Sequence, residues 1–213
     1  MKIALIGGTG FVGKAVLDEL LRRGHAVTAL ARDTGKYAGR DGVTAVKADA
    51  LDAQQVAAAV AGHDAVIDAY NPGWGLPDIH DLFLKGTEAI LDGVQAAGLK
   101  RVLVVGGAGS LFIAPGLQLI DTPEFPAEWK QGALAAREAL NRIRGRNALD
   151  WTFLSPPVHL APGERTGAYR VGGDEVPMVA GEPAGISVAD LAVAIVDEIE
   201  TPKHVQKRFT VYS

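Results

Sequence analysis

The segment IALIGGTGFVGKAV, residues 3–16, decides the fold of this chain. It begins as a short apolar strand, passes through three spaced glycines, Gly7, Gly10 and Gly13, and enters a helix. Gly8, Gly10 and Gly13 also complete the spacing G-x-G-x-x-G. Between a strand and a helix, this spacing predicts a site for the phosphates of a dinucleotide. Glycine lets the backbone approach a pyrophosphate, and the helix N-terminus supplies amides and positive potential.

The rest of the chain alternates short apolar runs with helical patterns. We expect strands at residues 2–6, 26–31, 43–47, 64–68, 101–105 and 150–154, and a closing strand in RFTVYS, residues 208–213. We expect helices near residues 11–23, 53–61, 79–97, 128–145 and 188–199. Asp52 with Gln55, and Ser187 with Asp190, are capping pairs for two of these helices. The alternation predicts an α/β fold: one Rossmann-like domain over residues 1–213, with a doubly wound parallel sheet in a three-layer sandwich.

Two long segments interrupt this alternation. Residues 106–127 and 155–186 are apolar yet rich in glycine and proline, and both begin just after expected strands. Long loops in a compact domain are usually functional. Because ligands of an open α/β sheet bind beyond the carboxyl ends of its strands, we expect these loops on the substrate side.

Composition and charge narrow the possible partners. The chain has 213 residues, 48% of them hydrophobic, a net charge of −4 and no cysteine. The absence of cysteine excludes disulfides, thiolate metal sites and a cysteine nucleophile. The acidic balance argues against direct binding of nucleic acid or an anionic membrane. The first apolar run is too short for a signal peptide. We therefore expect a cytoplasmic protein, a monomer or homodimer, that acts on a small molecule.

Arg32 at the end of the second expected strand indicates which cofactor is preferred. It lies 19 residues after Gly13, where a site for NAD usually carries an acidic side chain on the ribose 2′-hydroxyl. A guanidinium instead pairs well with a 2′-phosphate. We therefore expect NADP(H) to be preferred and NAD(H) to be possible. The alternatives are that Asp33 turns inward, or that Arg32 is only a solvated surface charge.

The other candidate contacts also follow strand ends. After the third strand, an acidic side chain and a small apolar patch suit adenine, although Asp49 and Asp52 fit equally well as a turn residue and a helix cap. The end of the fourth strand suits the ribose and nicotinamide, and the small residues after the fifth let a flat ring approach. The candidate cofactor-binding residues are Gly7, Thr9, Gly10, Phe11, Val12, Arg32, Asp49, Ala50, Leu51, Ala69, Tyr70, Asn71, Gly106 and Gly107. No metal site is expected, because the five histidines have no ligand spacing.

These features resemble the short-chain dehydrogenase/reductase superfamily over nearly the full length. The resemblance rests on GGTGFVG, Arg32, the turn at residues 49–52, the small residues after two strands and the segment 151–173. More narrowly, the chain is similar to an atypical NAD(P)-binding branch, which includes NmrA-like proteins and the biliverdin reductase B (flavin reductase) type.

The chain lacks the proton donor that is typical of the superfamily. Typical members carry Tyr-x-x-x-Lys on the helix after strand five, where the tyrosine donates the proton and the lysine lowers its pKa. Here that helix reads PAEWKQGALAAREAL and contains no tyrosine. Reduction of a flavin or quinone does not need a positioned proton donor, because orientation does most of the catalysis and solvent can supply the proton. The resemblance therefore implies an NADPH-dependent reductase of a flat conjugated acceptor.

Two alternatives remain open. An NmrA-like regulator would bind the cofactor without turnover, and a nucleotide-sugar epimerase or dehydratase is disfavoured by the missing Tyr/Lys pair. By resemblance to the biliverdin reductase B type, Ser110 is the candidate catalytic residue, in contact with substrate or nicotinamide; its alternative is a turn residue. The histidine of that type stands one residue late here, as His159, which is expected to be structural or exposed. Trp74 and residues 111–113 could roof the nicotinamide.

Overall fold

The computed structural model describes residues 1–213, and an eight-stranded sheet forms its centre. From one edge to the other the strands are β10 (Arg170–Gly172), β14 (Lys207–Tyr212), β8 (Asp150–Ser155), β5 (Arg101–Val105), β4 (Ala65–Asp68), β1 (Lys2–Ile6), β2 (Ala26–Ala31) and β3 (Val43–Lys47). All neighbours pair in parallel except β10, which runs antiparallel to β14. The order along the chain reverses between β1 and β4, which is where ligands of such sheets bind.

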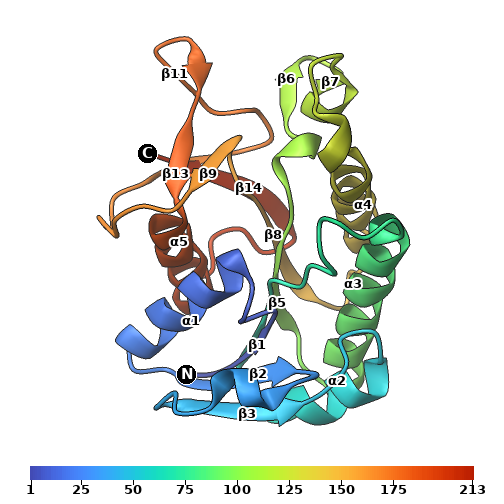
Figure 1. Cartoon of the computed structure of the whole chain (residues 1–213), viewed down its shortest axis with the longest axis vertical. Helices are drawn as coiled ribbons and strands as arrows, with labels where there is room; N and C mark the ends of the chain where they lie inside the picture. Colours follow the sequence, from blue (N-terminus) through green and yellow to red (C-terminus); the bar gives the residue numbers. More distant parts are fainter.

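Helices cover both faces of this sheet. Figure 1 shows α1 (Phe11–Arg22) and α5 (Val188–Glu200) on one side, and α3 (Ile79–Ala96) and α4 (Ala127–Ile143) with α2 (Ala53–Val60) on the other. Each face has its own core of 22 buried residues. Strands buried on both faces must be apolar throughout, which explains runs such as β5. The expected three-layer, doubly wound α/β fold is confirmed.

The expected elements lie within a few residues of their predicted bounds, and both capping pairs form. The Asp52 carboxylate accepts the amides of Gln54 and Gln55, and the Ser187 hydroxyl accepts the amide of Asp190 at 3.0 Å. The sequence did not predict β10, because three residues within a long loop carry no strand pattern. This short antiparallel strand is the one departure from an all-parallel sheet.

The two long loops contain small strands and contact each other. The first holds the 3-10 helices η2 (Ala108–Ser110) and η3 (Leu119–Asp121) and the hairpin β6 (Phe112–Ala114) with β7 (Leu117–Gln118). The second holds β9 (His159–Ala161), which pairs with β13 (Gly185–Ser187), and the pair β11 (Met178–Val179) with β12 (Glu182–Pro183). The Phe112 amide donates to the Asp174 carbonyl, and its carbonyl accepts from Val176, both at 2.9 Å. These bonds join the two loops beyond the carboxyl ends of the strands.

Candidate functional site

The turn between β1 and α1 has space for glycine alone at two positions. Gly7 has a φ of +80°, and a Cβ on it would lie 2.2 Å from the carbonyl oxygen of Ala69. A Cβ on Gly13, in the first turn of α1, would lie 2.1 Å from the carbonyl oxygen of Gly7. The Gly10 amide closes the turn by donating to that same carbonyl at 2.9 Å. Side chains here would push the turn away from β4 and from its own helix.

The N-terminus of α1 has no protein cap. Its N-cap is Gly10, no side chain accepts from the first-turn amides, and that turn contains no acidic residue. Such amides have no partner within a helix, and the helix dipole adds partial positive charge there. Thr9 and Phe11 are exposed around the turn, and Val12 is half-buried against the core. The arrangement fits the pyrophosphate of a dinucleotide.

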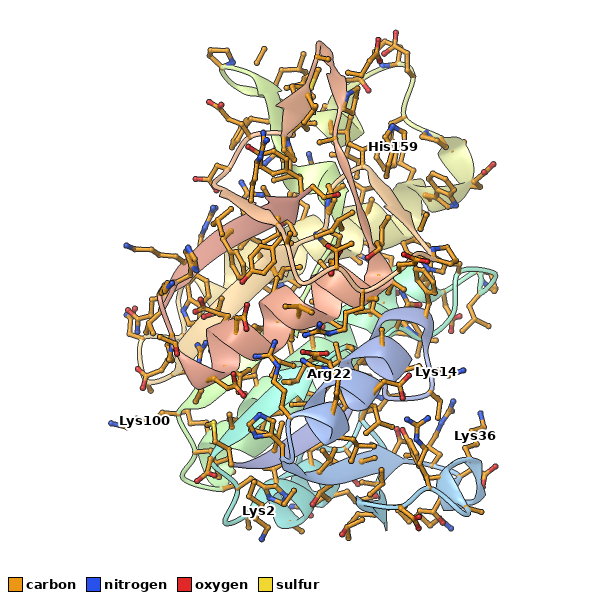
Figure 2. The ribbon with its side chains drawn as sticks, turned by 90° about the vertical axis from the view of Figure 1, so that its left-hand side faces the viewer. Lys2, Lys14, Arg22, Lys36, Lys100 and His159 are labelled. Carbon is orange, nitrogen blue, oxygen red and sulfur yellow. The ribbon has the colours of Figure 1, made fainter.

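A cationic side chain follows β2, the strand that pairs with β1 beside this turn. Arg32, directly after β2, is exposed and forms no hydrogen bond or ion pair with the chain. The neighbouring Asp33 is already used, because its carboxylate accepts the Gly35 amide at 3.0 Å and caps the 3-10 helix η1 (Thr34–Tyr37). Figure 2 shows Lys14 and Lys36 along the same edge of the molecule. The free charge at the end of β2 is thus a cation.

The acidic residues after β3 serve the local backbone. The Asp49 carboxylate accepts the Leu51 amide at 3.0 Å, and Asp52 caps α2. The reading of Asp52 as a helix cap is therefore confirmed. Ala50 and Leu51 are half-buried beside these carboxylates. Contact of adenine with residues 49–51 stays a prediction.

Tyr70, after β4, lies near the ends of three neighbouring strands. Burial is the main cause that raises its pKa to about 12; the charge of Arg32 lowers this pKa and the charge of Asp49 raises it. The ends of β2, β3 and β4 therefore lie within electrostatic reach of one phenol. Its ring packs against Gly86 of α3, where an added Cβ would lie 2.2 Å from the ring. This packing holds the ring beside the ends of these strands.

Asp68, the last residue of β4, is a buried carboxyl that the sequence reasoning missed. It is 2% exposed and pairs in register with Ile6 of β1 and Val104 of β5. Burial raises its pKa to about 7, and its hydrogen bond from the Tyr70 amide, at 2.9 Å, acts against this rise. The only sequence signal was an acidic residue that ends an otherwise apolar strand.

Small residues meet where β5 ends. A Cβ on Gly106 would lie 2.0 Å from the Phe153 ring, so this position excludes a side chain. A Cβ on Gly107 would lie 3.6 Å from Ala136 of α4, and one on Gly109 would lie 3.1 Å from Ala133. Helix α4 therefore presents alanine to the loop after β5. A proton donor with its lysine, as the family resemblance describes, is absent from this face.

Ser110 and Arg208 form a buried contact at this end of the sheet. Ser110 is 2% exposed, and its Oγ lies 3.4 Å from Nη1 of Arg208 on β14, which also reaches Ser155 Oγ at 3.5 Å. The same guanidinium binds the carboxylate and carbonyl of Asp174. The sequence did not predict this contact, since an alternating terminal strand gives no sign that a polar group is enclosed. The catalytic role of Ser110 stays a prediction.

His159 is an exposed side chain of the second long loop. His159 begins β9, where it is exposed and makes no side-chain hydrogen bond (Figure 2). No group of three or more histidine, aspartate or glutamate side chains is arranged to hold a metal ion. None of the helices combines the length and hydropathy that crossing a bilayer requires.

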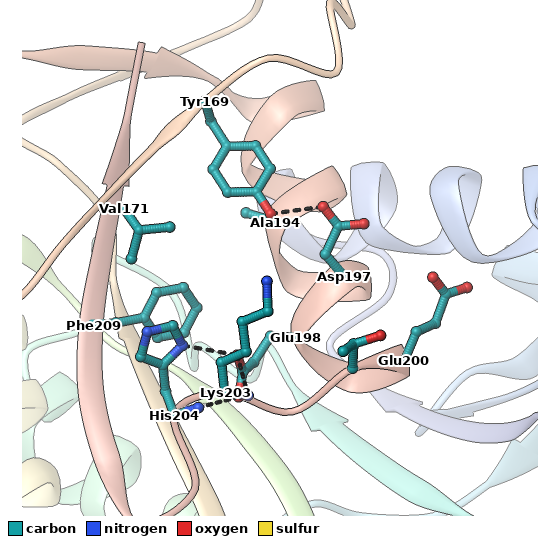
Figure 3. A pocket seen from close by; sticks show the side chains of 10 residues that line it. Tyr169, Val171, Ala194, Asp197, Glu198, Glu200, Lys203, His204 and Phe209 are labelled. Atoms are coloured by element: carbon teal, nitrogen blue, oxygen red, sulfur yellow. Dashed lines mark hydrogen bonds and ion pairs between the residues drawn. The ribbon is translucent and has the colours of Figure 1, made fainter.

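A hollow of about 220 Å³ lies elsewhere, at the C-terminal end of α5 and the start of β14. Figure 3 shows two of its polar pairs: Tyr169 donates to Asp197 at 2.6 Å, and His204 contacts Glu198 at 2.8 Å. His204 also stacks on Phe209, with ring centroids 4.3 Å apart. The hollow contains none of the residues expected to bind cofactor.

Comparison with known proteins agrees with this geometry. A family model described as NAD(P)H-binding matches residues 7–202. The chain is 39% identical to the uncharacterized protein YwnB of Bacillus subtilis, over 100% of this chain and 99% of that protein.

Two solved structures are similar over nearly their full length. One, described as a "putative epimerase" from Bacteroides thetaiotaomicron, has 45% identity and a TM-score of 0.92, over 99% of this chain and 96% of its own. The other, described as a "putative NADH-flavin reductase" from Streptococcus pneumoniae, has 36% identity and a TM-score of 0.87, over 100% and 99%. The expected placement in an atypical NAD(P)-binding branch is confirmed.

Proposed function

The chain belongs to the NAD(P)H-binding family, and on that premise we propose that it is an NADPH-preferring reductase of a flat conjugated acceptor, a flavin or a quinone. The observation that carries the acceptor class is the face of α4 toward β5, where Ala133 and Ala136 stand near the loop glycines. A carbonyl reductase needs a positioned acid at such a site, whereas an electron-poor ring needs mainly orientation.

The cofactor would lie across the strand ends already described. The turn with Gly7 and Gly10 and the free amides of α1 hold its pyrophosphate, and Arg32 pairs with its 2′-phosphate. The backbone of Gly106 and the more open position of Gly107 would lie against the nicotinamide, which supplies a hydride when bound. Net reaction consumes NADPH, one proton and the oxidised ring, and yields NADP⁺ and the reduced ring.

Ser110 is the candidate contact for the acceptor or nicotinamide. Arginine only donates hydrogen bonds, so Ser110 accepts from Arg208 and its own O–H remains available as a donor. A donor there would stabilise negative charge that develops on a ring carbonyl during hydride transfer. Because Ser110 is buried, the loops after β5 and β8 must part slightly when the acceptor enters.

A cofactor-sensing regulator is the second candidate. The two long loops carry exposed apolar side chains, namely Ile113, Leu117, Met178 and Val179, which a partner protein could cover. This function requires cofactor binding without turnover. An epimerase is less well supported, because α4 offers no acid–base pair to the site.

Oxidation of NADPH and NADH, followed at 340 nm with riboflavin, a water-soluble quinone and an aldehyde, tests the proposal. We expect oxidation with the flavin or quinone, faster with NADPH, and none with the aldehyde. Tight cofactor binding without oxidation of any acceptor would instead support the regulator.

A further inference from the structure

A buried polar cluster joins both substrate-side loops to the sheet, and hydride transfer does not account for it. The Arg208 side chain is 1% exposed. One of its nitrogens donates to Ser110, from the first loop, and to Ser155, at the end of β8. The other two bind Asp174, from the second loop. Enclosing a guanidinium costs free energy unless its donors are matched by acceptors, and here the Asp174 carboxylate supplies the negative charge.

A buried hydroxyl without a hydrogen-bond partner lies on the same face of β14 as Arg208. Thr210 is two residues beyond Arg208 on β14 and pairs in register with Ser155 of β8. Residues two apart on a strand, and residues directly opposite each other, share one face of a sheet. Thr210 is fully buried, yet its Oγ1 has no hydrogen-bond partner. Buried hydroxyls are almost always paired, so an enclosed orphan on the same face of the sheet as Arg208 points to an absent polar partner on that face.

Asp174 supplies the negative charge of the cluster and is its most exposed residue. The Asp174 side chain is 60% exposed, although its carboxylate touches the buried Arg208. Its backbone is held separately, by the bond from the Phe112 amide to its carbonyl. Rotation of the side chain alone would therefore free Nε of Arg208, while Nη2 stays bound to the Asp174 carbonyl and the loops stay joined. An anion that arrives between the loops could take its place.

We propose that Arg208 and Ser155, beside Ser110, form a subsite for an acidic group of the acceptor, a phosphate or carboxylate, and that Asp174 occupies this subsite in the free protein. A guanidinium with flanking hydroxyls suits either group, because both accept several charge-assisted hydrogen bonds. The proposal rests on the proposed function for the acceptor itself. It adds that an acidic group of the acceptor, attached to the flat ring directly or through a chain, lies toward β14.

Flavin mononucleotide and riboflavin test this directly, because they share one ring and differ by a phosphate. Affinities are measured by quenching of flavin fluorescence in the presence of NADP⁺. We expect the wild type to bind flavin mononucleotide about tenfold more tightly than riboflavin, as fits a charge-assisted contact. Arg208→Gln should reduce this ratio to about one, and Arg208→Lys should restore part of it.

Two further variants guard against effects of folding. Asp174→Asn, on the surface, removes the competing carboxylate and should tighten binding of flavin mononucleotide several-fold while leaving riboflavin unchanged. Arg165→Gln is the matched control, because Arg165 ties the same loop to Glu19 of α1 but lies outside the cluster. It should leave the ratio of the two affinities unchanged.

The outcomes separate this subsite from the function. Equal binding of the two flavins by the wild type, no binding of either, or an unchanged ratio in Asp174→Asn would overturn the subsite. NADPH oxidation by a quinone would still support the reductase in each of those cases. A ratio near ten that Arg208→Gln abolishes, in a protein that never oxidises NADPH, would keep the subsite and overturn the proposed function.

Discussion

The hydroxyl oxygen of Ser110 lies 3.4 Å from Nη1 of Arg208, although 98 residues separate them in the chain. The contact joins the loop after β5 to the last strand of the sheet, and both partners are buried. It fixes Ser110 as a hydrogen-bond acceptor toward the protein, which leaves its own proton to donate.

Replacement of Ser110 tests whether that proton serves the acceptor. We expect Ser110→Ala to lower kcat for flavin reduction about tenfold, because one donor to developing charge is lost. The dissociation constant for NADPH should stay within about twofold, since the proposed contacts to its pyrophosphate and 2′-phosphate lie after β1 and β2 and not in the loop that holds Ser110. Stopped-flow reduction and cofactor titration measure the two effects separately. Unchanged kcat with a lower melting temperature would make Ser110 a structural residue only.

Reversal of charge at Arg32 tests the cofactor preference. Arg32→Glu should weaken NADPH binding roughly ten- to hundredfold, because a charge-assisted bond to phosphate is worth about 1.5–3 kcal/mol. NADH binding should change by less than about threefold, since NADH has no 2′-phosphate. Arg144→Glu, an exposed reversal beyond the end of α4, controls for net charge. Equal losses for both cofactors would place the 2′-phosphate elsewhere.

A methyl group on Gly13 tests the fit of the turn. Gly13→Ala should destabilise the protein by about 1–3 kcal/mol, because its Cβ would meet the Gly7 carbonyl at 2.1 Å. Cofactor affinity should fall at least tenfold as the turn opens. Gly75→Ala, where a Cβ meets nothing within 4 Å, should leave both urea unfolding and NADPH titration unaltered. A Gly13→Ala protein that binds normally would contradict this account.

The buried carboxyl of Asp68 predicts a dependence of stability on pH. Its pKa is about 7 in the folded protein against 3.8 for the free group, so the folded state binds more protons between these values. The stability from this group is complete below pH 4 and is lost as the pH rises through 7. The loss is at most about 4 kcal/mol, because one pH unit corresponds to about 1.4 kcal/mol.

Asp68→Asn removes this titration while keeping an oxygen for the Tyr70 amide. In urea unfolding, the variant should be more stable than the wild type at pH 8, and its advantage should shrink toward pH 5. Asp41→Asn, at an exposed position, should show no such trend. Parallel stability curves for Asp68→Asn and wild type would show that Asp68 has an ordinary pKa.

The sequence by itself determined the fold and the glycine turn between β1 and α1. Both follow from local rules: apolar runs such as β5 must be buried on two faces, and glycine spacing between a strand and a helix allows close backbone approach. The caps at Asp52 and Ser187 were also readable, because a cap acts on amides two or three residues away.

Only the tertiary structure decided which side chains share an environment. Arg208 and Asp174 are polar residues in segments without a functional pattern, and Asp68 ends a strand where burial depends on both neighbouring strands. Burial, orphaned hydroxyls and shifted pKa values arise from atoms that are distant in the chain and close in space. Periodicity reports the face on which a residue lies, whereas packing between elements fixes what that residue meets there.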